Sequence, residues 1–196
     1  MKERTAAVKR KTLETAIDLT LNLDGQGTAE VHTGLGFLDH LLTSLACHAR
    51  LDLSLSCQGD LHIDDHHTVE DCGLALGQAL RQALGERRGI TRFGSALAPL
   101  DEALARAVVD LSGRPFATIN LELRRETLGN MATENITHFL RSLATASLIT
   151  LHVDMLRGEN DHHRAEAAFK ATALALRQAM AQDGSSGIPS SKGTLA

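Results

Sequence analysis

The chain is poor in aromatic residues: its 196 residues include no Trp, no Tyr and 5 Phe. Proteins that hold single-stranded nucleic acids stack the bases on aromatic rings, and proteins that bind duplexes present a basic surface. Here 20 Lys and Arg face 24 Asp and Glu, which gives a net charge of -4 and no basic excess. We therefore expect no nucleic-acid partner.

Long apolar runs and paired cysteines are missing as well. No run approaches the roughly 18 apolar residues of a membrane span, and residues 1–12 lack the apolar core of a signal peptide. The three cysteines, Cys47, Cys57 and Cys72, are odd in number and have no C-x-x-C spacing. These absences predict a reducing compartment, cytoplasmic or organellar, with no membrane partner; we take the cytoplasm as the prediction.

Histidine, in contrast, is abundant, with 10 residues, and it marks an internal repeat. The segment DHHTVE at 65–70 returns as DHHRAE at 161–166, and ALRQAL at 79–84 returns, at the same spacing, as ALRQAM at 175–180. Two further matches in the same order pair His40 with His138 and Glu14 with Glu102. We interpret the chain as one integrated domain made of a first half-repeat at 1–90 and a second at 91–185, followed by a short C-terminal tail at 186–196.

The repeat also guides the secondary structure. Apolar residues alternate with polar ones over 17–23 and again over 51–55, which predicts half-buried strands. The Ala-rich segment 102–111 has the composition of a helix, but its register with 14–23 predicts a strand. Helical spacing predicts helices over 37–49, 68–84, 136–147 and 169–180. The fold class is therefore α+β, with the four helices packed together and a sheet outside each pair.

The two HHxxE motifs have the spacing of metal ligands. On a helix, His66 and Glu70 share a face, whereas neighbouring histidines diverge by roughly 100°. His66 and His67 should therefore serve different ions, and each motif needs a ligand from elsewhere, for which His40 and His138 are the natural additions. This gives six His and two Glu, enough for two sites with three nitrogens and one oxygen each: His40, His66, His67, Glu70, His138, His162, His163 and Glu166.

Such a donor set leaves coordination positions open for water or substrate, which is typical of catalytic sites. The lack of a thiolate ligand favours manganese or iron over zinc. The spacing alone does not decide which histidine binds which metal. Of the other histidines, we expect His32 to be exposed and His62 and His152 to lie in strands as bystanders. His48 lies at the far end of its helix, where it either reaches the site or caps the helix.

A second group of candidate residues is basic. Arg92, Arg114 and Lys192 each lie in a turn that contains Gly, Ser or Pro. Basic side chains and backbone N–H groups in such turns can hold a phosphate. The alternative is that these are ordinary solvated turn residues.

These motifs together resemble those of one enzyme family. The segments are GLGFLDH (34–40), DLHIDDHHTVED (60–71), GITRFG (89–94), DLSGRP (110–115), NDHHRAEAAFKA (160–171) and IPSSKG (188–193). They are similar to imidazoleglycerol-phosphate dehydratase of histidine biosynthesis, over about residues 3–195. Ala49, Leu51 and Leu123 depart from the usual pattern and bear on local packing only. We expect a monofunctional form with no fused phosphatase.

The resemblance implies an activity, a cofactor and an assembly. The enzyme would be a lyase (a hydro-lyase) that converts D-erythro-imidazole-glycerol phosphate to imidazole-acetol phosphate and water. Two Mn²⁺ ions per active site, held by the eight ligands at subunit contacts, would stabilise a substrate imidazolate. The homo-oligomer would contain 24 chains built from trimers. The fold would place four helices between two four-stranded mixed sheets.

The resemblance also assigns roles to residues outside the ligand set. Glu14 would be the catalytic carboxylate that moves the carbon-bound proton. It would line the substrate site together with His48 and Lys170. The phosphate would be held by Arg92, Arg114, Ser190, Ser191 and Lys192, which would make 186–196 a C-terminal substrate-binding tail.

Two other functions fit parts of the same pattern. A binuclear hydrolase of a phosphorylated metabolite would use the same ions to activate water. A non-catalytic metal-binding protein would need the ligands but not the basic turns.

Overall fold

The elements of each half follow the same order along the chain. The computed structural model describes residues 3–195, so the expected outer boundaries at residues 1 and 196 lie outside the described residues. The first half contains β1 (Thr5–Lys11), β2 (Thr15–Asn22), β3 (Ala29–His32), α1 (Gly36–Ala49), β4 (Asp52–Gly59) and α2 (His66–Leu84). The second contains β5 (Phe93–Leu100), β6 (Ala103–Asp110), β7 (Phe116–Asn120), the short strands β8 (Thr127–Leu128) and β9 (Met131–Ala132), α3 (Thr133–Ser147), β10 (Thr150–Arg157) and α4 (Asp161–Met180).

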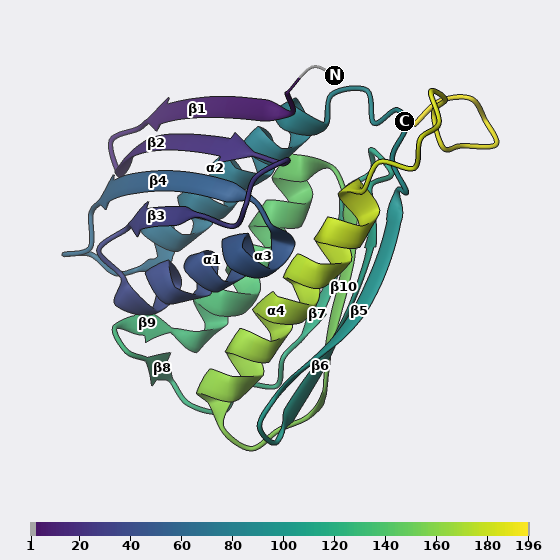
Figure 1. Ribbon diagram of the computed structural model, residues 1–196. Helices are drawn as coiled ribbons and strands as arrows, with labels where there is room; N and C mark the ends of the chain where they lie inside the picture. The colour runs from purple at the N-terminus through teal and green to yellow at the C-terminus, as the bar shows by residue number, and fades with distance from the viewer. Residues whose placement is uncertain (1–2, 196) are drawn as a thin grey trace.

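Two four-stranded sheets enclose the helices. Their strand orders, β1-β2-β4-β3 and β5-β6-β10-β7, are equivalent. In each sheet the first two strand pairs in this order are antiparallel, and the last pair is parallel. Helices α1 and α2 lie against the first sheet, α3 and α4 against the second, and the helix layers meet through α1–α4 and α2–α3 contacts (Figure 1). The predicted α+β class, with four helices between two mixed sheets, is confirmed.

The Ala-rich segment is a strand, as its register predicted. In β6, Ala103, Ala105 and Ala107 face the core, and the intervening side chains face outward. Small residues on this face allow α4 to pack closely on the second sheet. At Gly94 of the adjacent strand β5, an added Cβ would lie 1.9 Å from the carbonyl oxygen of Ala175 in α4. Tertiary packing, not helix propensity, decides the conformation here.

Helices α2 and α3 approach each other at glycines. A Cβ built on Gly77 would lie 2.6 Å from the carbonyl oxygen of Leu143 and 2.7 Å from the Cβ of Ala146. One turn earlier, a Cβ on Gly73 would lie 3.0 Å from the carbonyl oxygen of Phe139. The backbones of the two helices are therefore in direct contact, which fixes the spacing of the side chains that they carry.

We expect Gly77→Val to destabilise the fold by about 2–3 kcal/mol, because the added side chain forces two packed helices apart. The measurement is the midpoint of urea unfolding at a fixed protein concentration. Gly36→Val is the control, since an added Cβ at this helical glycine meets no atom within 4 Å. Equal midpoints for the two variants would contradict the close packing.

The bystander histidines lie outside the helical core. His32 is exposed on β3 and His152 lies in strand β10, as expected, and the side chain of His152 is also exposed. The expected strand at His62 is wrong: residues 61–63 form a turn, closed by the N–H of Ile63 donating to the carbonyl oxygen of Asp60 at 2.8 Å. Leu61 and Ile63 imitate the alternation of a strand, but both are exposed. None of the described helices is long and apolar enough to cross a membrane.

Candidate metal centres

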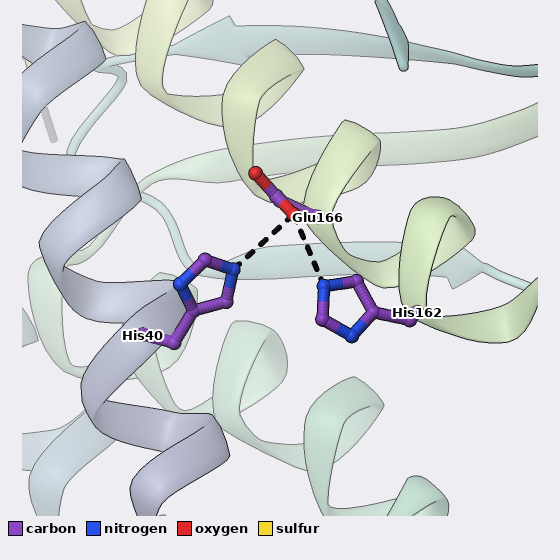
Figure 2. A group of neighbouring side chains, drawn as sticks. All are labelled: His40, His162 and Glu166. Carbon is purple, nitrogen blue, oxygen red and sulfur yellow. Dashed lines mark hydrogen bonds and ion pairs between the residues drawn. The ribbon is translucent and has the colours of Figure 1, made fainter. Parts of the chain in front are cut away.

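The first candidate centre, cluster A, joins α1 to α4. It consists of His40 on α1 and of His162 and Glu166 on α4. Figure 2 shows both imidazoles directed at the same carboxylate: Oε2 of Glu166 lies 3.2 Å from Nε2 of His40 and 3.3 Å from Nε2 of His162. Because His162 and Glu166 are one helical turn apart, α4 presents both on one face.

The second candidate centre, cluster B, joins α2 to α3. It consists of His66 and Glu70 on α2 and of His138 on α3. Nε2 of His138 lies 3.1 Å from Oε1 of Glu70, and Nε2 of His66 lies 3.9 Å from Oε2 of the same carboxylate. The rings of His66 and His138 are stacked, with their centroids 4.8 Å apart. In each cluster the three ligand atoms lie within 4.8 Å of one another.

Each cluster combines residues from both halves of the chain. His40 of the first half meets the HHxxE motif of the second half, and His138 of the second half meets the motif of the first. The cause is the packing of the helices, since α1 lies on α4 and α3 lies on α2. The sequence left these partners open, and the helix packing pairs each upstream histidine with the motif of the other half.

The second histidine of each motif points away from its neighbour. The ring planes of His66 and His67 are 76° apart, and those of His162 and His163 are 90° apart. With Nδ1 as the donor, His67 contacts Asp60 at 3.0 Å and His163 contacts Glu102 at 2.8 Å. A histidine held in this way through Nδ1 presents Nε2 as a metal ligand.

Carboxylates set the charge around these two histidines. The hydrogen bond to Asp60 raises the pKa of His67, and the hydrogen bond to Glu102 raises the pKa of His163; partial burial opposes both shifts. In turn, the N–H of Asn160, the His163 ring and the N–H of Glu159 lower the pKa of Glu102 to about 2. Glu102 is therefore ionised at neutral pH and holds the His163 ring in place.

Glu14 lies beside the same group of residues. Its Oε1 is 3.6 Å from Nε2 of His67. The turn between β1 and β2 fixes its backbone: the Oγ1 of Thr12 accepts from the N–H of Glu14 at 3.1 Å, and the N–H of Asp60 donates to the carbonyl oxygen of Glu14 at 3.1 Å. Its own side chain is 52% exposed and can meet a ligand from outside.

The basic candidates lie at the other end of the helices. The N–H of Arg92 donates to the carbonyl oxygen of Ala179 near the end of α4, thirteen residues and about 20 Å along the helix from Glu166. The Arg92 guanidinium donates to Asp110 at 2.8 and 3.1 Å and to the carbonyl oxygen of Pro189 in the tail at 2.8 Å. Arg92 and the tail are therefore together, but remote from cluster A within one chain.

The remaining candidates divide between the same two ends. Lys170 lies at the metal end, where its Nζ is 2.8 Å from Oε1 of Glu166. His48 lies in the last turn of α1, eight residues and about 12 Å along the helix from His40. Arg114 is exposed in a turn that leads into β7. In the tail, Ser191 and Lys192 are exposed, and the Oγ of Ser190 accepts from the N–H of Lys192 at 3.2 Å.

Several residues near the centres were absent from the sequence-based candidates, among them Glu102, which contacts His163. Asp60 orients His67, and Asn135 contacts Nδ1 of His66 through its Oδ1 at 3.1 Å. The ring of Phe37 packs edge-on against His162, with the centroids 5.1 Å apart. A usable signal existed for Asn135, which is an amide on the same helical face as His138, one turn earlier and in a buried position.

Comparisons with known proteins identify the relatives of this chain. The family model described as "Imidazoleglycerol-phosphate dehydratase" matches residues 33–176. The imidazoleglycerol-phosphate dehydratase of Candida glabrata is 57% identical over 97% of this chain and all of its own length; that of Saccharomyces cerevisiae is 53% identical over 100% of both. A relative of the same name from Phytophthora nicotianae is 59% identical, but the chain spans only 43% of its length.

Solved structures give the same assignment of fold. The crystal structure of imidazoleglycerol-phosphate dehydratase from Staphylococcus aureus is 36% identical, with a TM-score of 0.82 over 91% of this chain and 99% of that one. The enzyme from Pyrococcus furiosus, solved in complex with (S)-C348, is 36% identical, with a TM-score of 0.83 over 96% of this chain and 100% of that one. The two sheets and four helices are thus shared with proteins of known structure.

Proposed function

This chain belongs to the imidazoleglycerol-phosphate dehydratase family, and from that premise we propose that it is a hydro-lyase of histidine biosynthesis. Its substrate is D-erythro-imidazole-glycerol phosphate, and its products are imidazole-acetol phosphate and water. The observation that carries the proposal is the pair of matched clusters, A and B. A substrate that contains an imidazole ring offers two ring nitrogens, one for each centre.

The ligands fit divalent manganese. Each cluster offers two imidazole nitrogens and a carboxylate oxygen within 4.8 Å of one another, with no thiolate. Such a set suits Mn²⁺, and it leaves positions open for a further histidine and for substrate. When bound, the two Mn²⁺ ions would supply positive charge next to the substrate imidazole, where negative charge develops as the carbon-bound proton leaves.

A second copy of the chain completes each centre in this proposal. His67 and His163 are held by Asp60 and Glu102 outside clusters A and B, with Nε2 available. Arg92 and the tail lie about 20 Å along α4 from cluster A. One chain therefore separates groups that must act on one small substrate. We place the complete sites at contacts between copies, in a homo-oligomer of 24 chains built from trimers.

Glu14 acts as the proton-transfer group. The proton to be removed lies on a carbon that is not adjacent to a carbonyl, so its acidity is poor and a positioned base is needed. Glu14 combines a fixed backbone with an exposed carboxylate, 3.6 Å from Nε2 of His67. Proton removal by Glu14 and departure of the hydroxyl leave an enol, which becomes the ketone of the product.

The remaining candidates bind the rest of the substrate. Arg92, Arg114, Lys192 and the hydroxyls of Ser190 and Ser191 are suited to a phosphate by charge and by their positions in turns. Lys170 and His48 complete the lining. The substrate is a small phosphorylated metabolite. We propose that the protein is located in the cytoplasm.

We expect the Mn²⁺ form, incubated with imidazole-glycerol phosphate, to produce the ketone stoichiometrically and to release no inorganic phosphate. The measurement follows ketone formation and phosphate in the same sample. Release of phosphate would favour the binuclear hydrolase instead. Binding of Mn²⁺ with neither product would favour a metal-binding protein without catalysis.

A further inference from the structure

The two metal centres differ in the residue that follows the glutamate by one helical turn. In cluster A this residue is Lys170, whose Nζ lies 2.8 Å from Oε1 of Glu166. In cluster B the residue four positions after Glu70 is Leu74. The repeat aligns Leu74 with Lys170, so the matched halves carry a cation beside one centre and an aliphatic side chain beside the other.

Lys170 and Glu166 form a shielded ion pair. The side chains of Glu166 and Lys170 are 13% and 19% exposed, against 37% for Glu70. The Lys170 ammonium contacts Oε1 of this carboxylate, and Nε2 of His40 lies 3.2 Å from Oε2. One oxygen of Glu166 is thus already paired with an ammonium.

Cluster B is prepared for a metal ion in a different way. Asn135 contacts Nδ1 of His66 at 3.1 Å, which turns Nε2 of this ring toward Glu70. The residue that the repeat aligns with Asn135 is Phe37, which packs on His162 and forms no such hydrogen bond. Cluster B therefore combines an oriented imidazole with a carboxylate that has no ammonium partner among the described residues.

From these differences we propose that the two centres have unequal affinities for a divalent cation, with cluster B filling first and cluster A being weakened by Lys170. The ammonium of Lys170 occupies one carboxylate oxygen of Glu166 and repels an incoming dication at short range in a shielded site. Because each centre receives one partner histidine in the proposed assembly, that contribution is common to both and does not remove the difference. The inference rests on the metal binding proposed above, and not on the reaction.

The test is a titration of the full-length chain with Mn²⁺ alone, following free Mn²⁺ by electron paramagnetic resonance. We expect two classes of site whose dissociation constants differ by about tenfold or more. Glu166→Ala removes a ligand of cluster A and should leave the tighter class of sites. Glu70→Ala removes a ligand of cluster B and should leave the weaker class. A single class of two equal sites, or the opposite assignment, would overturn the inference.

Exchanging the two aligned residues gives a matched pair of variants. Lys170→Leu should tighten cluster A about tenfold, and Leu74→Lys should weaken cluster B by a similar factor. Lys170→Met is the second variant, which carries the test if Leu74→Lys does not fold, as judged by circular dichroism. Unchanged affinity of cluster A in both Lys170 variants would refute the role of the lysine.

The outcomes separate this inference from the proposed function. If two equal Mn²⁺ sites are found and the ketone still forms, the inference fails and the function stands. If no Mn²⁺ binds to either cluster, the inference fails together with the proposed metal centres. If two unequal Mn²⁺ sites are found but no ketone forms, the inference stands and the proposed function fails.

Discussion

Glu14→Gln is expected to bind Mn²⁺ with the affinity of the unmodified chain and to turn over about 10²–10⁴-fold more slowly. Glutamine has nearly the same shape as glutamate but cannot accept the carbon-bound proton. The Thr12 and Asp60 contacts to Glu14 are made by its backbone, so the turn should persist in the variant. The loss should therefore appear in kcat and leave metal content and folding unchanged.

The measurement is kcat for ketone formation, together with the Mn²⁺ content of the same sample. Glu30→Gln is the matched control, since Glu30 is an exposed carboxylate on β3 whose nearest ionic partner is His32, at 3.8 Å. Near-normal turnover of Glu14→Gln would mean that a group other than Glu14 removes the proton. Asp60 would be a poor replacement, because its carboxylate already accepts from His67.

His163→Ala is expected to lose Mn²⁺, the large assembly and at least about 10³-fold of the activity, although clusters A and B remain intact within the variant chain. The reason is that His163 lies outside both clusters, with its ring held by Glu102 and its Nε2 available to a neighbouring copy. If ligands were supplied only within one chain, the same substitution would leave metal binding unchanged.

Light scattering of the purified variant measures the size of the assembly, and metal analysis measures its Mn²⁺ content. Glu70→Ala, which removes a ligand within cluster B, is the reference variant. His152→Ala is the control, because His152 is an exposed histidine on the outer face of β10. A metal-replete, fully assembled and active His163→Ala enzyme would remove His163 from the ligand set. It would also remove the main argument for a centre shared between copies.

The sequence predicted the elements that have a clear apolar pattern or a clear counterpart in the other half of the repeat. The strand β6 was recognised through its register with β2 and not through its Ala-rich composition, and all four helices were located by apolar spacing. The strands β1, β3, β5 and β7, by contrast, received no individual prediction. They lie at the sheet edges, where exposed positions include charged residues such as Lys9 and apolar ones such as Phe93 and Phe116, so their pattern is weak.

The sequence could not assign partners to the candidate ligands. Spacing placed His66 and Glu70 on one helical face and predicted that His67 diverges, because both statements concern a single helix. Which helix supplies the other imidazole depends on α1 packing against α4, and this is decided by the whole core. The same reasoning explains why the sequence did not predict that Arg92 lies at the end of α4 that is remote from Glu166.

The exchange of upstream histidines between halves has a consequence for the origin of such a chain. Within residues 3–195, one strands-helix-strand-helix unit on its own contains no complete cluster, because its upstream histidine faces the motif of the other unit. Two identical units paired as these halves are would form two equivalent centres at once. A short ancestral protein of this design would need to pair before it could hold metal, and joining the two copies in one polypeptide would then free each centre to diverge, as Lys170 and Leu74 have.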